Sequence, residues 1–387
     1  MLQQTTESSE RRVRAREIVL SQVKSARPFA TPTTNDTFLR FVPSLVSRDD
    51  DGVICECEYS EEFLEKPSLG LAVMLLNQYC DNVKPFADSL MEISGLYGKP
   101  VDSLQKPVRK FLLMSMLGEK PNIETLLDDL EGKPATWFVT AHLVGIVPES
   151  RIFLSADVIL RRLDEADLAY EVPLQARLIT NPPYRPFPDS VLQATIVSDD
   201  IGAVQRRVEA ICRVLSLYRE TGASWSSLSI QSSSFSQIGM SQTLLVPIAQ
   251  EPRARLKQGD EENLAKFVRD FIDKLPSGLM DDKLVGPLDV SMRRYLDSTR
   301  GNLPIPERLT STVMGLEALL LENQGEARFR LAIRSANLLR LLKEDPASVY
   351  RDLLEAYDYR SAHVHGSALS DDKQARAGQL LGSLGGI

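Results

Sequence analysis

The stretch YDYRSAHVHG, residues 357–366, holds two of the three histidines of the chain, His363 and His365. Arg360 stands five positions before His365. Arginine is a permanent cation that forks onto phosphate, and histidine exchanges a proton near neutral pH. The pair therefore predicts phosphodiester binding and proton transfer, the chemistry of metal-free RNA cleavage. A purely structural cap is the alternative, because both residue types satisfy the last carbonyls of helices.

Apolar periodicity predicts a helix over residues 348–365, and Gly366 is then the residue at which the helix ends in a left-handed turn. On a regular helix Arg360 and His365 differ by about 140° around the axis. Their side chains therefore lie on either side of the apolar face of this helix and do not point in one direction. One chain then lacks a compact site, and two copies packed seam to seam about a twofold axis would build it.

Further helices are expected at residues 288–300, 307–322 and 327–342, and their short connections are typical of an all-α bundle. The segment 328–343 contains five cations and no acidic residue. One face of its helix is predicted to carry Arg330, Arg334 and Asn337. This stripe is either an RNA track or a solvated helix face.

Several segments of this bundle occur in the order found in one family. They are ERL at 307–309, GLEALL at 315–320, RSANLL at 334–339 and YRSAHVHG at 359–366. This part of the chain resembles the HEPN domains (higher eukaryotes and prokaryotes nucleotide-binding) of the ApeA-like group. The family signature is Arg, four to six residues, then His, which Arg360 and His365 match with four residues between them.

The resemblance implies a small helical bundle that forms a homodimer through the motif helices. Many HEPN domains are metal-independent endoribonucleases of toxin, CRISPR and anti-phage systems. Arg360 would hold the scissile phosphate, and His365 would move the proton as a ribose 2′-hydroxyl attacks, leaving a 2′,3′-cyclic phosphate. Ser361 replaces the Asn, Asp or His common in active members and would donate a hydrogen bond. His363 would assist or face solvent. A non-catalytic module that binds nucleic acid or a protein partner is the second interpretation.

The composition is that of an ordinary globular protein, with 43% hydrophobic and 25% charged residues. A net charge of −8 excludes nucleic-acid binding by bulk electrostatics, so RNA contact needs a local basic patch. Four cysteines without a CxxC pair and three histidines argue against a zinc site. No Walker loop or dinucleotide fingerprint is found, so neither metal nor cofactor is expected. The polar N-terminus and the short apolar runs predict a cytoplasmic protein without membrane spans.

The whole chain is predicted to be a multi-domain α+β protein, with an N-terminal mixed α/β region that contains a β-sheet and a C-terminal all-α bundle. The expected strands lie at 37–46, 53–59, 137–147, 151–161, 176–180, 191–197, 225–230 and 243–246. The expected parts are a polar arm at 1–35, an α+β domain at 36–250 with a subdomain split near 133, a linker helix at 251–280, the HEPN-like bundle at 281–372 and a flexible tail at 373–387.

Other polar clusters are expected to be structural. The four arginines within residues 11–16 predict a solvated helix face, with an RNA-binding arm as the alternative. The acidic residues 49–51 predict a hairpin turn instead of a calcium loop. His142 is expected to be a hydrogen-bonded strand residue. The serine-rich segment 232–236 is interpreted as a flexible loop. The sequence does not identify a ligand or trigger for residues 36–250.

Overall fold

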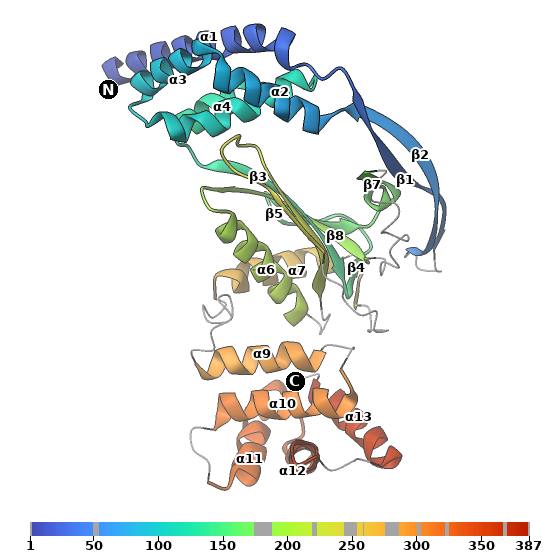
Figure 1. Cartoon of the computed structure of the whole chain (residues 1–387). Helices are drawn as coiled ribbons and strands as arrows, with labels where there is room; N and C mark the ends of the chain where they lie inside the picture. Colours follow the sequence, from blue (N-terminus) through green and yellow to red (C-terminus); the bar gives the residue numbers. More distant parts are fainter. Residues whose placement is uncertain are drawn as a thin grey trace.

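A computed structural model describes residues 2–48, 54–173, 188–218, 223–243, 254–257, 259–274, 286–299, 303–321, 325–366 and 370–385. Figure 1 shows a group of N-terminal helices, a central part built on β-sheets, and a C-terminal group of helices. The expected mixed α+β class is confirmed.

The N-terminal part consists of helices packed on one another. They are α1 (Leu2–Ala30), α2 (Leu69–Asn82), α3 (Lys84–Tyr97), α4 (Val101–Met116) and α5 (Ile123–Glu131). The expected polar arm at 1–35 is wrong, because α1 buries Ala15, Ile18 and Val19 in the common core of these helices. Small apolar residues at helical spacing form that face, and the many charges around them hide it in the sequence.

Helices α4 and α5 were not expected, although local signals mark their ends. Asn122 caps α5 by accepting the backbone N–H of Glu124 at 2.9 Å, which satisfies one free donor of the first turn. Gly132 ends the same helix in the left-handed conformation, with φ of 80°. The short helix between these signals buries Leu127 and Leu130.

Strands β1 (Asn35–Arg48) and β2 (Ile54–Pro67) form a long antiparallel hairpin, and β7 (Tyr170–Pro173) pairs with β1. The hairpin arches away from the central sheet in Figure 1. The strands expected at 37–46 and 53–59 are confirmed and extend beyond those limits. The expected turn at 49–51 lies outside the described residues.

Among the described residues, six strands form the central sheet in the order β10-β9-β3-β8-β6-β5. Their bounds are Ala135–Val144 for β3, Ile152–Ser155 for β5, Val158–Arg162 for β6, Ser190–Ser198 for β8, Ser224–Ser232 for β9 and Met240–Thr243 for β10. Alternation along β3 buries Trp137 and Val139 on one face. Helices α6 (Ile201–Leu217) and α7 (Asp260–Phe271) pack against this face (Figure 1).

The segment expected as a linker helix at 251–280 contains a helix in its described part, but it is not a linker. Strand β11 (Ala254–Leu256) pairs in parallel with β4 (Ile146–Pro148). Helix α7 buries Leu264 and Val268 in the core of the central sheet. The helical pattern is visible in the sequence, but the surface that receives it is not. The expected strand at 176–180 and residues 244–246 lie outside the described residues.

The serine-rich segment 232–236 is anchored, so its interpretation as a flexible loop is wrong. Phe235 is 4% exposed and packs against Phe111 of α4, with 5.3 Å between ring centroids. Asp129 of α5 accepts two backbone N–H groups of the segment, at 2.6 and 3.2 Å. Lys110 of α4 donates to the carbonyl group of Ser234 in the segment and to that of Gln237 just after it. This segment therefore fixes the central sheet to the N-terminal helices.

The C-terminal part is the expected group of helices: α9 (Pro287–Thr299), α10 (Ile305–Leu320), α11 (Ala327–Leu339), the short 3₁₀ turn Arg340–Leu342, α12 (Pro346–Val364) and α13 (Asp371–Gly385). The flexible tail at 373–387 is wrong in its described part. Helix α13 buries Ala377, Leu380 and Leu384 in the bundle core. These residues recur at helical spacing within a glycine-rich composition that otherwise suggests disorder.

Candidate functional site

Helix α12 carries the candidate residues, and local signals set both of its ends. Asp345 caps its start by accepting the N–H groups of Ala347 at 3.3 Å and Ser348 at 3.0 Å. Just beyond its other end, Gly366 has φ of 73°, a left-handed conformation that non-glycine residues rarely adopt. The predicted glycine stop after His365 is confirmed.

Arg360 is held by a carboxylate from α10. Its Nη2 lies 3.1 Å from Oε2 of Glu317, and its guanidinium lies 5.6 Å from the centroid of the Tyr357 ring. The side chains of Arg360 and Glu317 are 23% and 18% exposed, so this pair is better shielded from solvent than an ordinary surface pair. The Nε–H of Arg360 is buried and meets no acceptor among the described residues, which leaves one donor of the guanidinium unsatisfied.

The histidines lie at the open end of α12. His365 is exposed, while His363 and Ser361 are half-buried. The backbone N–H of His365 donates to the carbonyl of Ser361 at 3.1 Å and closes the last turn. Among the described residues, Arg360 pairs with Glu317, and no hydrogen bond or ion pair joins it to His365. One chain thus presents the cation and the proton carrier apart from each other.

Close packing of α9 and α10 fixes the position of Glu317. A Cβ atom added at Gly315 would lie 3.2 Å from Cβ of Arg294 and 3.3 Å from the carbonyl oxygen of Ser291, so glycine permits this approach. Glu317 is a site residue that the sequence pattern alone did not predict. The sequence nevertheless indicates it, because a glutamate within the apolar segment 315–320 needs an ion-pair partner if it is shielded from water.

The expected basic stripe lies on α11, where Arg334 and Asn337 are exposed and Arg330 is half-buried. Arg330 donates to the carbonyl of Gly325 at 3.4 Å, and Arg334 donates to the carbonyl of Leu320. Exposed apolar side chains lie along the same segment: Phe329 at 49%, Ile333 at 51%, Leu338 at 43% and Leu341 at 74%. A surface that mixes large apolar groups with arginine is more typical of protein contacts than of a phosphate track.

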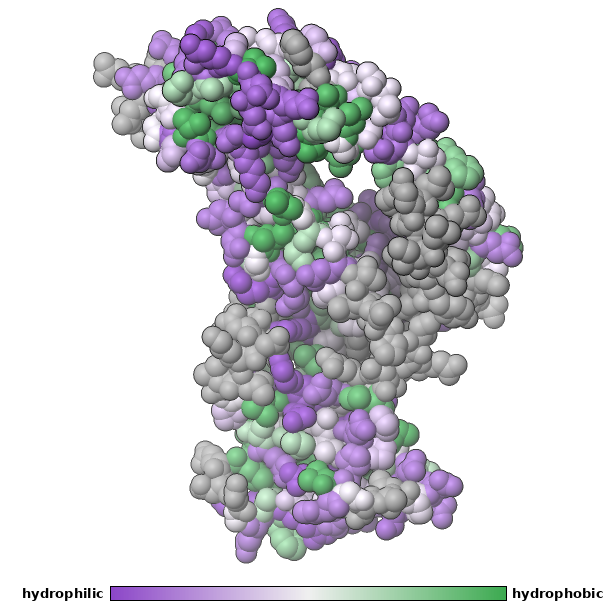
Figure 2. All heavy atoms as spheres, viewed as in Figure 1, coloured by the Kyte–Doolittle hydropathy of each residue, from purple (hydrophilic) through white to green (hydrophobic). Residues whose placement is uncertain are grey.

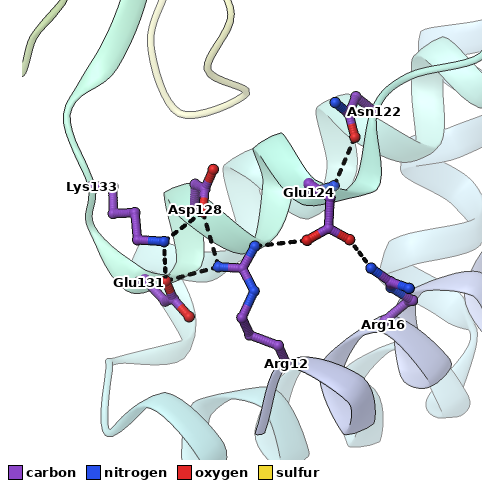
Figure 3. Close-up of polar contacts among 7 residues, drawn as sticks. All are labelled: Arg12, Arg16, Asn122, Glu124, Asp128, Glu131 and Lys133. Atoms are coloured by element: carbon purple, nitrogen blue, oxygen red, sulfur yellow. Dashed lines mark hydrogen bonds and ion pairs between the residues drawn. The ribbon is translucent and has the colours of Figure 1, made fainter. Parts of the chain in front are cut away.

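Two arginines of the N-terminal cluster serve as ties between helices. Arg12 pairs with Glu124, Asp128 and Glu131 of α5 at 2.8, 2.9 and 2.8 Å. Arg16 also contacts Glu124, as Figure 3 shows. Arg12 is 21% exposed and lies among carboxylates, so it belongs to no free RNA-binding arm, whereas Arg14 and Arg16 are exposed as expected for a solvated helix face.

The remaining histidine and the described buried cysteines are structural. Nδ1 of His142 lies 2.7 Å from Oγ of Ser227 on the neighbouring strand, which confirms its hydrogen-bonded interpretation. Burial raises the thiol pKa of Cys80 to about 11 and that of Cys212 to about 12, so both are poor nucleophiles at neutral pH. No group of three or more metal-ligating side chains is found within the described residues.

Comparison with known proteins finds no matching family model, curated protein or solved structure. Within the described ranges, no helix combines the length and apolarity that a bilayer span requires. What the site can do must therefore be argued from the geometry around Arg360 and His365.

Proposed function

We propose that the chain is a metal-independent endoribonuclease of the HEPN type that acts on RNA as a homodimer. One observation carries the proposal. Arg360 is oriented by a shielded contact with Glu317, five residues before an exposed His365, on a helix that stops at Gly366. This places a fixed cation and an exposed proton carrier on one short segment, in the order of the HEPN signature.

The chemistry needs only these side chains and the RNA itself. Arg360 would donate hydrogen bonds to the non-bridging oxygens of the scissile phosphate. His365 would take the proton of the ribose 2′-hydroxyl as its oxygen attacks phosphorus, and would return a proton to the leaving 5′-oxygen. The products carry a 2′,3′-cyclic phosphate and a 5′-hydroxyl. Ser361 would hydrogen-bond the phosphate, and the half-buried His363 would take no part in the proton transfer.

A dimer is required because Arg360 and His365 diverge by about 140° around α12. Exposed apolar side chains lie on the two helices that hold the ion pair, with Val364 53% and Leu319 45% exposed. A twofold contact over these residues would bury them. It would also bring His365 of one chain toward Arg360 of the second copy.

Two features favour a second candidate function, a non-catalytic module that binds a partner. Arg360 is already engaged by Glu317, and Ser361 is a weaker base than an Asp or His at that position. The exposed apolar residues of α11 would then serve the contact. In either case, action in anti-phage defence follows from the family resemblance, and action in the cytoplasm follows from the polar N-terminus and the short apolar runs.

The deciding experiment is cleavage of mixed cellular RNA by the purified chain in EDTA. Wild type is compared with His365→Ala and with His363→Ala, a matched control two residues away on the same helix end. We expect fragments with cyclic phosphate ends from wild type and His363→Ala, and none from His365→Ala. Light scattering measures whether each of the three proteins is a dimer.

A folded wild-type dimer that cleaves no RNA would favour the binding module. In that case, RNA affinity measured at several salt concentrations should fall in Arg330→Ala and Arg360→Ala if the partner is RNA. Equal cleavage by wild type and His365→Ala would contradict the assignment of the proton carrier.

A further inference from the structure

The hairpin formed by β1 and β2 leaves a strand edge open. The strand order β2-β1-β7 places β2 at the border of its sheet, and among the described residues it pairs with β1 alone. Figure 2 shows an opening between this hairpin and the central sheet, so part of the hairpin stands away from the body. The outer backbone groups of this 14-residue strand therefore meet no neighbouring strand of the described chain.

Strand β2 is long, and over most of its length charged side chains are the only one of the usual features that protect an edge strand. Exposed edge strands are normally short, bulged or interrupted by proline. The hairpin has two register shifts: the shift between Pro43 and Leu45 places its extra residue on β1, and the shift between Ser47 and Arg48 places Cys55 as an extra residue near the start of β2. Beyond this point β2 itself has no extra residue as far as Pro67, its one proline and its terminal residue. The edge is a regular template for another extended segment.

The side chains along β2 select the partner by charge. Alternation places Glu61, Phe63 and Glu65 on one face of the strand and Glu58 and Glu62 on the other. The Phe63 side chain is 62% exposed, and all four glutamates are exposed. The hairpin sequence, residues 35–67, contains nine acidic and three basic residues.

We propose that the free edge of β2 binds an extended cationic peptide as an added strand. Main-chain hydrogen bonds would supply the contact, and alternate side chains would supply the selectivity. Lysine or arginine at alternate positions of the peptide would face Glu61 and Glu65, with the Phe63 ring between them as a cation–π partner. The same carboxylates repel the β2 edge of a second copy and the phosphates of RNA.

The test uses the full chain and a fluorescein-labelled nonapeptide that alternates lysine and threonine. Two further versions carry N-methyl groups on either the lysine or the threonine amides. In an added strand only alternate N–H groups face the template. One N-methylated version should therefore lose binding in fluorescence anisotropy, while the other binds like the unmodified peptide.

Protein variants locate the site. Glu61→Gln combined with Glu65→Gln should weaken binding about fivefold, in line with two exposed ion pairs, and Phe63→Ala should weaken it further. Glu119→Gln, which changes an exposed glutamate in the connection between α4 and α5, is the matched control and should leave affinity unchanged.

No binding at millimolar peptide, or equal binding of both N-methylated versions, would overturn strand addition. An equal loss of peptide affinity in Glu119→Gln would show that only overall charge matters, and it would also overturn strand addition. If a 12-nucleotide oligouridine binds wild type but not the β2 variants, the ligand of this edge is RNA and not a peptide. None of these readouts depends on RNA cleavage.

Discussion

Replacing Glu317 by alanine tests whether the ion pair is what orients Arg360. The two side chains are 18% and 23% exposed, and their charged atoms lie 3.1 Å apart. A hydrogen bond between charged groups contributes about 1.5–3 kcal/mol, and removing one partner leaves the other charge shielded and unpaired. We expect the free energy of opening α10 and α12 to fall by about 2 kcal/mol.

Hydrogen exchange read by mass spectrometry measures this change locally, without requiring the whole chain to unfold in one step. A loss of about 2 kcal/mol corresponds to roughly 30-fold faster exchange, because each 1.4 kcal/mol is tenfold. Peptides from α10 and α12 should show it, and peptides from the central sheet should not.

The matched control is Asp358→Ala in the same bundle. Asp358 pairs with Arg328 at 2.6 Å, but these side chains are 59% and 36% exposed. An exposed pair contributes about 0.5 kcal/mol, so exchange should rise less than about threefold. Equal changes in the two variants, or a change below threefold in Glu317→Ala, would refute the claim that shielding makes the Arg360 contact special.

Three further predictions concern the rest of the molecule. Phe235→Ala should lower the free energy of unfolding by about 3–4 kcal/mol, because the ring is buried between the sheet and the N-terminal helices; Phe138→Ala, whose ring is 52% exposed, should change the thermal midpoint little. Burial alone would raise the pKa of Asp128, but hydrogen bonds from Lys133 and Arg12 outweigh burial and lower the pKa below its ordinary value (Figure 3). The stabilisation is therefore present above the unfolded pKa of about 3.9 and is lost as pH falls through the lower folded value; exchange in α1, corrected for intrinsic rates, should accelerate below that pH, and a flat profile would contradict it. The Cys212 thiol, whose pKa burial raises to about 12, should not react with Ellman's reagent at pH 8 until the chain is unfolded; reaction of the native protein at the rate of a free thiol would show that the side chain is accessible.

Local sequence patterns predicted much of the fold. The helices at 201–217 and 346–364 follow apolar residues at helical spacing, and β3 follows alternation around Trp137. The errors share one cause. Helices α1 and α13 and the segment around Phe235 are polar or glycine-rich on average, and each contributes only a few apolar side chains to a core made by distant residues.

The amino-acid sequence alone determined the α+β class, the helix that carries Arg360 and His365, and its end at Gly366, because periodicity and glycine conformation act over a few neighbouring residues. Tertiary structure decided that Glu317 holds Arg360, that the N-terminal arginines bind carboxylates of α5, and that β2 presents an open edge. Arg360 and Glu317 are 43 residues apart in the sequence, and Arg12 and Glu124 are 112 residues apart. Only the packing of helices and strands against one another brings such groups within reach.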